Sequence, residues 1–393
     1  AAQGLGAAIM MALAVAAAGE TVPKARTGSA MGLLGATSAI GTALGPSLGG
    51  LLIAGSGWRA IFLVNLPLGA VAFLLARRAM PADRREPGTD RTRFDTVGTV
   101  LLALTLAAYA LAMTTGRGGF GPVNVLLLAA AAAGAGLFVA AERRTRSPLV
   151  RLATFRDAAL RAGLATSALV ATVMMATLVV GPFYLSRALG LDAAPTGLAM
   201  SAGPLVAALA GMPAGRLVDR FGAHRMIVAG LVGMAAGAFG LSLVRTGLGL
   251  AGYLAPVTVV TAGYALFQAA NNTAVMTGVG PDRRGVVSGM LNLSRNLGLI
   301  TGAAVLGAVF AVSSGASDMA GAAAEAVAAG TRVTFAVAAA LIVVALAVAS
   351  TARGSVCTLR TRGDSCSCDL HASLSRRHPN GTTALRSRTL RSR

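Results

Sequence analysis

Charged residues are scarce in this sequence, and acidic residues are the scarcest. Asp, Glu, Lys and Arg together make up 12% of the 393 residues, and only 14 of them are carboxylates. A soluble globular domain carries about 25% charged residues. Long apolar runs such as 96–115 and 331–350 take their place. The low charge therefore excludes an ordinary soluble protein.

These apolar runs have the length needed to cross a bilayer. A helix rises about 1.5 Å per residue, so about twenty residues cross a hydrocarbon core roughly 30 Å thick. The alternating segments typical of a membrane β-barrel are missing from the sequence, which leaves helices as the spanning structure. We predict an all-α membrane protein with eleven spans, at residues 1–19, 28–54, 59–79, 96–115, 121–141, 159–184, 195–215, 225–243, 249–276, 285–312 and 330–350.

Cysteine and histidine are missing from the expected spans. All three cysteines lie behind the last span, so no disulfide framework holds the body of the protein together. The three histidines lie in a loop or in the same tail, which leaves no catalytic pair inside the membrane for an enzyme. The Cys and His spacing in the tail fits no standard zinc site, and no phosphate-binding loop with Lys-Ser/Thr is present. We expect no enzyme activity, no cofactor and no metal.

The basic residues are distributed unevenly between the loops. Nineteen cations lie in one alternate set of loops and five in the other, so the first set is predicted to be cytoplasmic. A formal charge of +20 would suggest nucleic-acid binding in a soluble protein. Here the arginines lie in short loops and in the tail, so we expect no nucleic-acid partner. The tail from Arg353 is then cytoplasmic, and Ala1 begins on the outer side, which requires an odd number of earlier spans.

A repeat with an offset of 257 residues indicates two related halves. The offset pairs glycines with glycines: Gly28 with Gly285, Gly32 with Gly289, Gly41 with Gly298, Gly45 with Gly302 and Gly50 with Gly307. Both members leave a cytoplasmic loop in the same direction, as parallel repeats about an axis along the membrane normal do. Two unrelated glycine-rich helices would be the simpler explanation.

A Gly-Pro motif lies in the second expected span. Its residues are Gly41, Gly45, Pro46, Gly49 and Gly50. Three of the glycines are four positions apart, which places them on one helix face and allows a close helix crossing. The proline removes a backbone donor and bends the helix, as a hinge would require. Ordinary packing of small residues is the alternative.

Together with its flanks, this motif resembles a known transporter family. Gln3-Gly-Leu-Gly lies before it, Pro23-Lys-Ala-Arg26 follows, and Trp58-Arg59 leads to Asn65 and Pro67. The combination is similar to the fourteen-span drug:proton antiporter branch of the major facilitator superfamily, the EmrB/QacA type. The resemblance covers everything except the tail. It implies that the Gly-Pro motif lies in the fifth span and that this chain, truncated at its N-terminus, carries eleven of fourteen spans.

The resemblance also implies a domain plan. Residues 1–79 would be the remnant of an N-terminal helical bundle holding spans four to six. Residues 80–141 would be two linking spans with a cytoplasmic loop, and residues 142–352 a C-terminal six-helix bundle related to the first by pseudo-symmetry. Residues 353–393, rich in Arg and Ser, are predicted to be a disordered cytoplasmic tail.

One cytoplasmic loop looks like the second-half copy of the superfamily's gate motif. Its residues are Gly215, Asp219, Arg220, Gly222 and Arg225. The carboxylate could cap the helix that follows it and pair with one of the two arginines, so that two helices are held together on the inner face. A tight turn with orienting arginines is the alternative.

Polar residues inside the spans are candidates for lining a substrate cavity. Arg295 lies near the expected midplane, where an arginine costs about 2.5–3.5 kcal/mol unless it faces a cavity or a partner. The full candidate set is Gln268, Asn271, Asn272, Asn292, Arg295 and Asn296. We favour cavity lining, although an interhelical structural network would use the same residue types.

None of the 14 carboxylates lies in the middle of an expected span. In the family that the sequence resembles, an acidic residue in the first span commonly carries the proton. That span is outside this sequence, so the proton site is unknown. We expect a monomeric, proton-coupled exporter of drugs or other hydrophobic small molecules in a bacterial cell membrane, working by alternating access. The alternatives are a dedicated metabolite or self-resistance antibiotic exporter of the same superfamily, or a truncated fragment without function.

Overall fold

The structure is a computed structural model that describes residues 2–57, 59–79, 95–115, 121–145, 148–280, 283–315 and 323–363. Within these ranges all regular structure is helical. The chain divides into two compact units, Ala1–Ala349 and Ser350–Arg393. The prediction of an all-α membrane protein is confirmed. Nine of the described helices are long and apolar enough to cross a membrane.

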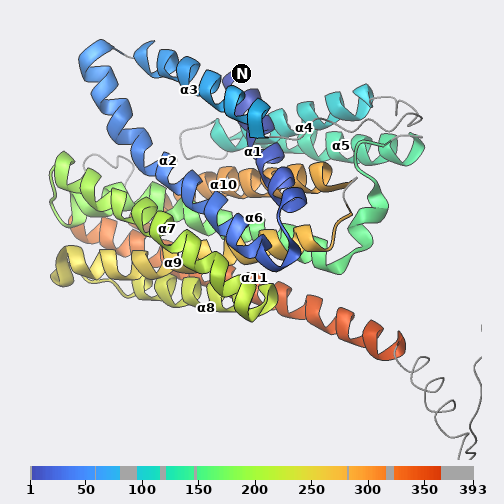
Figure 1. Ribbon diagram of the computed structural model, residues 1–393. Helices are drawn as coiled ribbons and strands as arrows, with labels where there is room; N and C mark the ends of the chain where they lie inside the picture. The colour runs from blue at the N-terminus through green and yellow to red at the C-terminus, as the bar shows by residue number, and fades with distance from the viewer. Residues whose placement is uncertain are drawn as a thin grey trace, which may run out of the picture. The chain divides into compact units, whose positions relative to one another are not determined.

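Each of the eleven expected spans corresponds to one α-helix of the described chain (Figure 1). The helices are α1 (Ala2–Thr21), α2 (Thr27–Ser56), α3 (Arg59–Ala79), α4 (Thr96–Thr114), α5 (Pro122–Arg144), α6 (Ala158–Phe183), α7 (Ala193–Phe221), α8 (Ala223–Ser242), α9 (Gly249–Thr277), α10 (Arg284–Ser314) and α11 (Ala324–Gly363). Helices α1 and α2 are not among the nine, and the apolar stretch of α1, Gln3–Gly19, is shorter.

Local sequence sets several of the helix ends. Asp95 accepts a hydrogen bond from the Gly98 amide at 2.8 Å and so caps α4. Asp157 does the same for α6, with the Ala159 amide at 2.9 Å. Gly222 has φ +87°, a conformation that glycine adopts without a steric penalty, and it lets the chain pass from α7 directly into α8.

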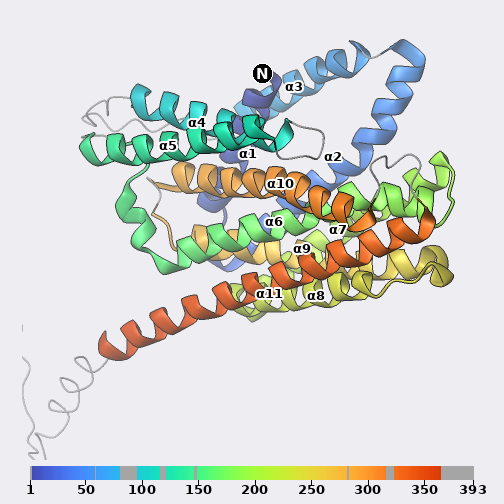
Figure 2. The same ribbon diagram turned by 180° about the vertical axis from the view of Figure 1, so that it is seen from behind.

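The main core lies among α6 to α11. Its largest fully buried side chains include Tyr184, Tyr253, Phe310 and Phe335, and the first two stack with ring centroids 5.5 Å apart. The most extensive helix pairings are α8 with α9, α6 with α10, α2 with α7, and α4 with α5, and the view from behind in Figure 2 shows α10 beside α6. Helix α3 instead exposes large apolar side chains such as Leu63 and Leu66, which suits a face that contacts lipid.

The two members of the predicted repeat have matching lengths. Helix α2 begins at Thr27 and α10 at Arg284, which is the offset of 257 residues found in the sequence. They end at Ser56 and Ser314, so their ends agree with the same offset to within one residue. The repeat therefore describes two helices of nearly equal extent.

The structure corrects the start of the expected disordered tail. Helix α11 continues past residue 353 and ends at Gly363. Extending an existing helix costs much less than nucleating a new one, so a few polar residues can remain helical behind an apolar span. The rest of the predicted tail, residues 364–393, lies outside the described residues.

Candidate functional site

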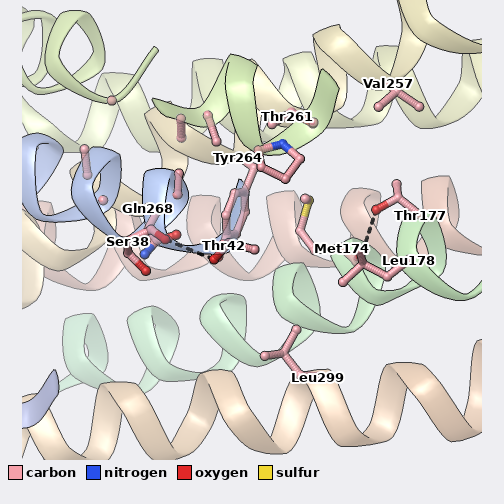
Figure 3. A pocket seen from close by; sticks show the side chains of 18 of the residues that line it. Ser38, Thr42, Met174, Thr177, Leu178, Val257, Thr261, Tyr264, Gln268 and Leu299 are labelled. Carbon is pink, nitrogen blue, oxygen red and sulfur yellow. Dashed lines mark hydrogen bonds between the residues drawn. The ribbon is translucent and has the colours of Figure 1, made fainter. Parts of the chain in front are cut away.

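A cavity of about 220 Å³ lies where α2 meets the helices of the main core. Its lining comes from α2, α6, α7, α9 and α10. In the view of Figure 3, Gln268 gathers with Ser38 and Thr42 at one end, while Thr177 and Leu178 lie at the other. The lining is mostly apolar with a few hydroxyl and amide groups, which is the usual composition of a small-molecule site.

A second cavity, of about 370 Å³, adjoins the first. It is lined by residues of α1, α2, α6, α9 and α10. The two cavities share five lining residues: Gly35, Ser38, Tyr264, Gln268 and Arg295. These residues therefore form a common wall that a molecule in either cavity would meet.

The structure brings most of the predicted polar residues to this place. Gln268 and Arg295 line both cavities, and Asn271, Asn272 and Asn292 line the second. Asn296 lines neither of the two; it is exposed and its amide donates to the carbonyl oxygen of Asn292 at 2.9 Å. The side chain of Asn296 therefore contributes to its own helix rather than to the cavities.

Asn271 fits the alternative explanation, an interhelical structural network. Its side chain is buried, and its Nδ2 donates to the carbonyl oxygen of Gly163 on α6 at 3.1 Å. Ser294 likewise donates to the carbonyl oxygen of Leu164 at 2.5 Å and ties α10 to α6. The polar groups thus divide into helix-binding residues and residues that remain available to a ligand. Substrate binding by the available residues stays a prediction.

Several polar lining residues were not in the predicted set. Tyr264 and Thr261 on α9 line the first cavity, as do Ser38, Thr42 and Thr177. For Tyr264 and Thr261, the signal in the sequence was the spacing to Gln268 along α9, because residues three, four or seven positions apart share a helix face. Tyr264 lies four positions before Gln268, so the position of Gln268 could have predicted that Tyr264 lies on the same face of α9.

Charge in the two cavities has one sign. Arg295 is the one charged residue among the residues that line them, and no carboxylate is in either lining. Its side chain is partly buried. This agrees with the scarcity of carboxylates in the spans and leaves the cavity walls positively charged within the described part of the chain.

The gate motif forms an interhelical contact, but to a different helix from the one expected. Asp219, near the end of α7, accepts hydrogen bonds from the amides of Gly28 and Ser29 at 2.7 and 2.9 Å, and also from the Ser29 hydroxyl. The expectation that it caps the following helix is wrong, because α8 begins at the Gly222 cap without a side-chain cap bond. Asp219 instead caps α2, which precedes it by about 190 residues.

The start of α2 is a favourable place for this carboxylate. The first amides of a helix have no partner inside the helix, and the helix dipole places partial positive charge at this end. Three hydrogen bonds to one ionised group make a strong contact between α2 and α7. Of the other motif residues, Arg220 lies over the Phe221 ring at 5.2 Å and Arg225 is exposed.

Glycines let α2 and α7 approach closely just beside this contact. A Cβ atom added to Gly215 would lie 2.5 Å from the carbonyl oxygen of Gly28, and one added to Gly211 would lie 2.8 Å from that of Gly32. In both helices the two glycines are four positions apart. A small-residue crossing therefore lies at Gly28 and Gly32 of α2, in addition to the one predicted for the Gly-Pro motif.

The Gly-Pro motif lies within α2, whose bounds include all its residues. Gly41 is exposed, with open space where a Cβ would stand. The surroundings of Gly45, Pro46, Gly49 and Gly50 lie outside the described side chains. In the repeat partner α10, Gly298 and Gly302 pack against the backbone of α6 at Ala168 and Thr172. The hinge role of the motif stays a prediction.

The described residues contain no group of three or more potential metal-binding side chains. Most of the cysteine- and histidine-bearing tail, including Cys366, Cys368 and His371, lies outside the described residues. The site is therefore built from apolar, hydroxyl, amide and guanidinium groups.

Comparison with known proteins places this architecture in a family. The family model of the Major Facilitator Superfamily matches residues 1–303. The chain is 34% identical over 321 residues to the multidrug resistance protein Stp of Mycobacterium tuberculosis, covering 79% of this chain and 58% of Stp. It is 35% identical over 333 residues to the drug efflux pump JefA of the same organism, covering 80% of this chain and 62% of JefA.

A relative named for a metabolite also matches. The riboflavin transporter RibZ of Clostridioides difficile is 29% identical over 315 residues, covering 79% of this chain and 67% of RibZ. The chain spans 58% and 62% of the lengths of Stp and JefA. With a family model matched over most of its length and an all-helical fold of membrane-crossing helices, the chain belongs to the Major Facilitator Superfamily.

Proposed function

We propose that this chain forms part of a secondary active exporter of drugs or other hydrophobic small molecules. The observation that carries the proposal is the pair of adjoining cavities between α2 and the helices α6, α9 and α10, beside a breakable contact between α2 and α7. A transporter needs both features, a binding site between two bodies and a latch between those bodies that can open.

The latch suggests which conformation the structure represents. The Asp219 contact lies at the ends of α2 and α7 that carry the basic loops, which the positive-inside rule makes cytoplasmic. In the proposed cycle, this contact closes the cavities toward the cytoplasm. In the proposed cycle, breaking the contact exposes the cavities to the cytoplasm and forming it again directs a bound molecule outward.

We further propose proton coupling and membership of the fourteen-span drug:proton branch. The two names that indicate drug efflux support export, and the pairing of α4 with α5 supports a pair of linking helices. In this plan α1–α3 belong to the first bundle and α6–α11 form the second. The protein would be a monomer in a bacterial cell membrane with its tail in the cytoplasm. The proton-binding residue remains unassigned.

A transport experiment tests the proposal directly. Bacteria that express the natural protein containing this chain are loaded with a panel of fluorescent hydrophobic compounds of different charge, and retention is measured against cells with an empty vector. The expected result is lower retention in the expressing cells, and an uncoupler should raise this retention to the level of the empty-vector cells. Equal retention of every compound in both strains would reject export, and a difference that persists with the uncoupler would reject proton coupling.

Transport of one dedicated metabolite is the second candidate. The relative named as a riboflavin transporter and the several hydrogen-bonding groups of the shared wall favour it. A polar metabolite would need most of these groups, whereas a promiscuous drug site depends on shape and apolar area. Export of one compound of the panel, abolished by Gln268→Ala, would favour this candidate over multidrug efflux.

A further inference from the structure

Arg295 occupies an unusual position in the described chain. It extends from α10 into the wall that the two cavities share, together with Tyr264 and Gln268 from α9. Its charge is therefore presented to both cavities rather than to a membrane surface. Polar and charged groups at this depth are costly and are retained where they bind something.

No carboxylate in the described chain neutralises this arginine. Neither cavity has an Asp or Glu in its lining, and no described carboxylate pairs with Arg295. Those with assigned contacts act elsewhere: Asp95 and Asp157 cap α4 and α6, and Asp219 binds the start of α2. An arginine cannot relieve this situation by losing its proton, because its guanidinium stays charged at all physiological pH values.

An anionic group is the natural occupant beside such a residue. The guanidinium presents a planar fork of donors that matches a carboxylate with two parallel hydrogen bonds. Away from the arginine, the first cavity presents apolar groups such as Met174, Leu178, Val257 and Leu299. Methionine side chains adapt to ligands of irregular shape. The first cavity thus combines one fixed cation with a large apolar surface.

We propose that the cavities select amphipathic anions, molecules with an apolar ring system and a carboxylate that binds Arg295. The inference rests on the proposed export function and deepens it by naming the substrate class. Molecules with the same ring system and a positive charge are disfavoured, because they would place two like charges together in a site of low dielectric constant.

Three fluorescent probes with one ring system test this selectivity. They are 9-anthracenecarboxylate, its uncharged amide, and 9-anthracenemethylammonium. Binding to the purified natural protein is measured by fluorescence titration in phosphatidylcholine nanodiscs at neutral pH. A hydrogen-bonded charge contributes about 1.5–3 kcal/mol, so we expect the anion to bind roughly ten- to hundred-fold more tightly than the amide, and the cation to bind most weakly.

Variants of the arginine separate its charge from its volume. Arg295→Gln should reduce the affinity for the carboxylate to that for the amide and leave the amide almost unchanged, while Arg295→Lys should keep the preference in weaker form. Arg245→Gln is the matched control, since Arg245 is exposed and lines neither cavity. Equal loss for all three probes in Arg295→Gln would mean a structural role and would overturn the proposal.

Two further outcomes would also overturn it. Equal affinity of the unmodified protein for the carboxylate and the amide would show that another part of the protein already neutralises Arg295. A loss of carboxylate binding when phosphatidylglycerol replaces part of the phosphatidylcholine would assign the arginine to a lipid headgroup. The titration measures binding and the retention assay measures export, so each proposal has its own experiment. A failure of the anion selectivity is therefore distinguishable from a failure of the export function.

Discussion

At the scale of single residues, four glycines, which have no side chain, determine how closely α2 and α7 approach. Gly28 and Gly32 on one helix face Gly211 and Gly215 on the other, and a Cβ at any of the four would lie within 3 Å of the opposite helix. Close packing of backbones replaces hydrophobic burial as the attraction between helices in lipid. Each of these glycines is therefore needed for the contact that positions Asp219.

Gly32→Ala should destabilise the protein. The added methyl group would overlap the backbone at Gly211 and Gly215, and overpacking costs about 1–3 kcal/mol. We expect a lower midpoint of thermal unfolding in detergent. Gly136→Ala is the control, because open space surrounds Gly136 and alanine favours the helix by about 0.5–1 kcal/mol. Equal midpoints for the two variants would contradict the close crossing.

Asp219→Asn should loosen the cytoplasmic contact. The amide keeps one acceptor oxygen but loses the charge that binds the start of α2, and hydrogen bonds to a charged group contribute about 1.5–3 kcal/mol. A Ser38→Cys reporter in the cavity wall is placed in a background without native cysteines. It should react roughly ten-fold faster with an impermeant maleimide in inside-out vesicles when Asp219 is replaced. Asp192→Asn, at a helix start without a side-chain cap bond, should leave the rate unchanged.

At the scale of elements, α4 and α5 meet at a pair of carboxylates. Asp95 Oδ2 and Glu142 Oε1 are both buried and without a hydrogen-bond partner in the described structure. Both lie close to Gly98, since a Cβ there would stand 2.5 Å from the first oxygen and 2.9 Å from the second. Two buried acceptors thus lie near the same glycine and neither has a donor in the described structure, which weakens the pairing of these helices.

Glu142→Gln should therefore stabilise the pair. The glutamine amide supplies the missing donor toward Asp95, and its oxygen can still accept from the Val150 amide, which lies 3.4 Å from the native Oε2. A gain of about 1 kcal/mol is expected from one satisfied buried acceptor. The apparent melting temperature at neutral pH measures it. Glu325→Gln at the start of α11 serves as the control, and a lower melting temperature for Glu142→Gln would contradict the donor argument.

The sequence predicted the elements better than their contacts. Apolar runs determine where helices lie, so each of the eleven expected spans corresponds to a helix, and nine of these helices are long and apolar enough to cross a membrane. The polar positions of α9 and α10 led to Gln268 and Arg295, which line the first cavity. The target of Asp219 was missed because a single sequence contains no signal that joins residues 190 positions apart. The crossing at Gly28 and Gly32 was missed, because these glycines have the same four-residue spacing as the Gly-Pro motif and only the neighbouring helix identifies them.

At the scale of the whole molecule, the basic loops predict the orientation of the protein in the membrane. The loop after α5 carries Arg151, and the loop between α8 and α9 carries Thr246. These loops lie at opposite ends of their helices, so the positive-inside rule places the first in the cytoplasm and the second outside. The proposed direction of transport depends on this assignment.

Labelling of two single-cysteine variants measures the orientation. In a background without the native cysteines, Thr246→Cys should react with an impermeant maleimide in intact cells, and Arg151→Cys should react only after the cells are permeabilised. Both residues are exposed, so access to reagent differs only by the side of the membrane. The reverse pattern would place the Asp219 contact on the outer face and invert the proposed cycle.

The glycine faces of the two repeat helices complement one another. Gly28 and Gly32 are covered by α7 while their partners Gly285 and Gly289 are bare; Gly298 and Gly302 are covered by α6 while Gly41 is bare. An alanine at one of the bare positions would therefore meet open space, whereas an alanine at a covered position would meet the backbone of α6 or α7, so the two repeat helices should tolerate substitution on different stretches of the same glycine pattern.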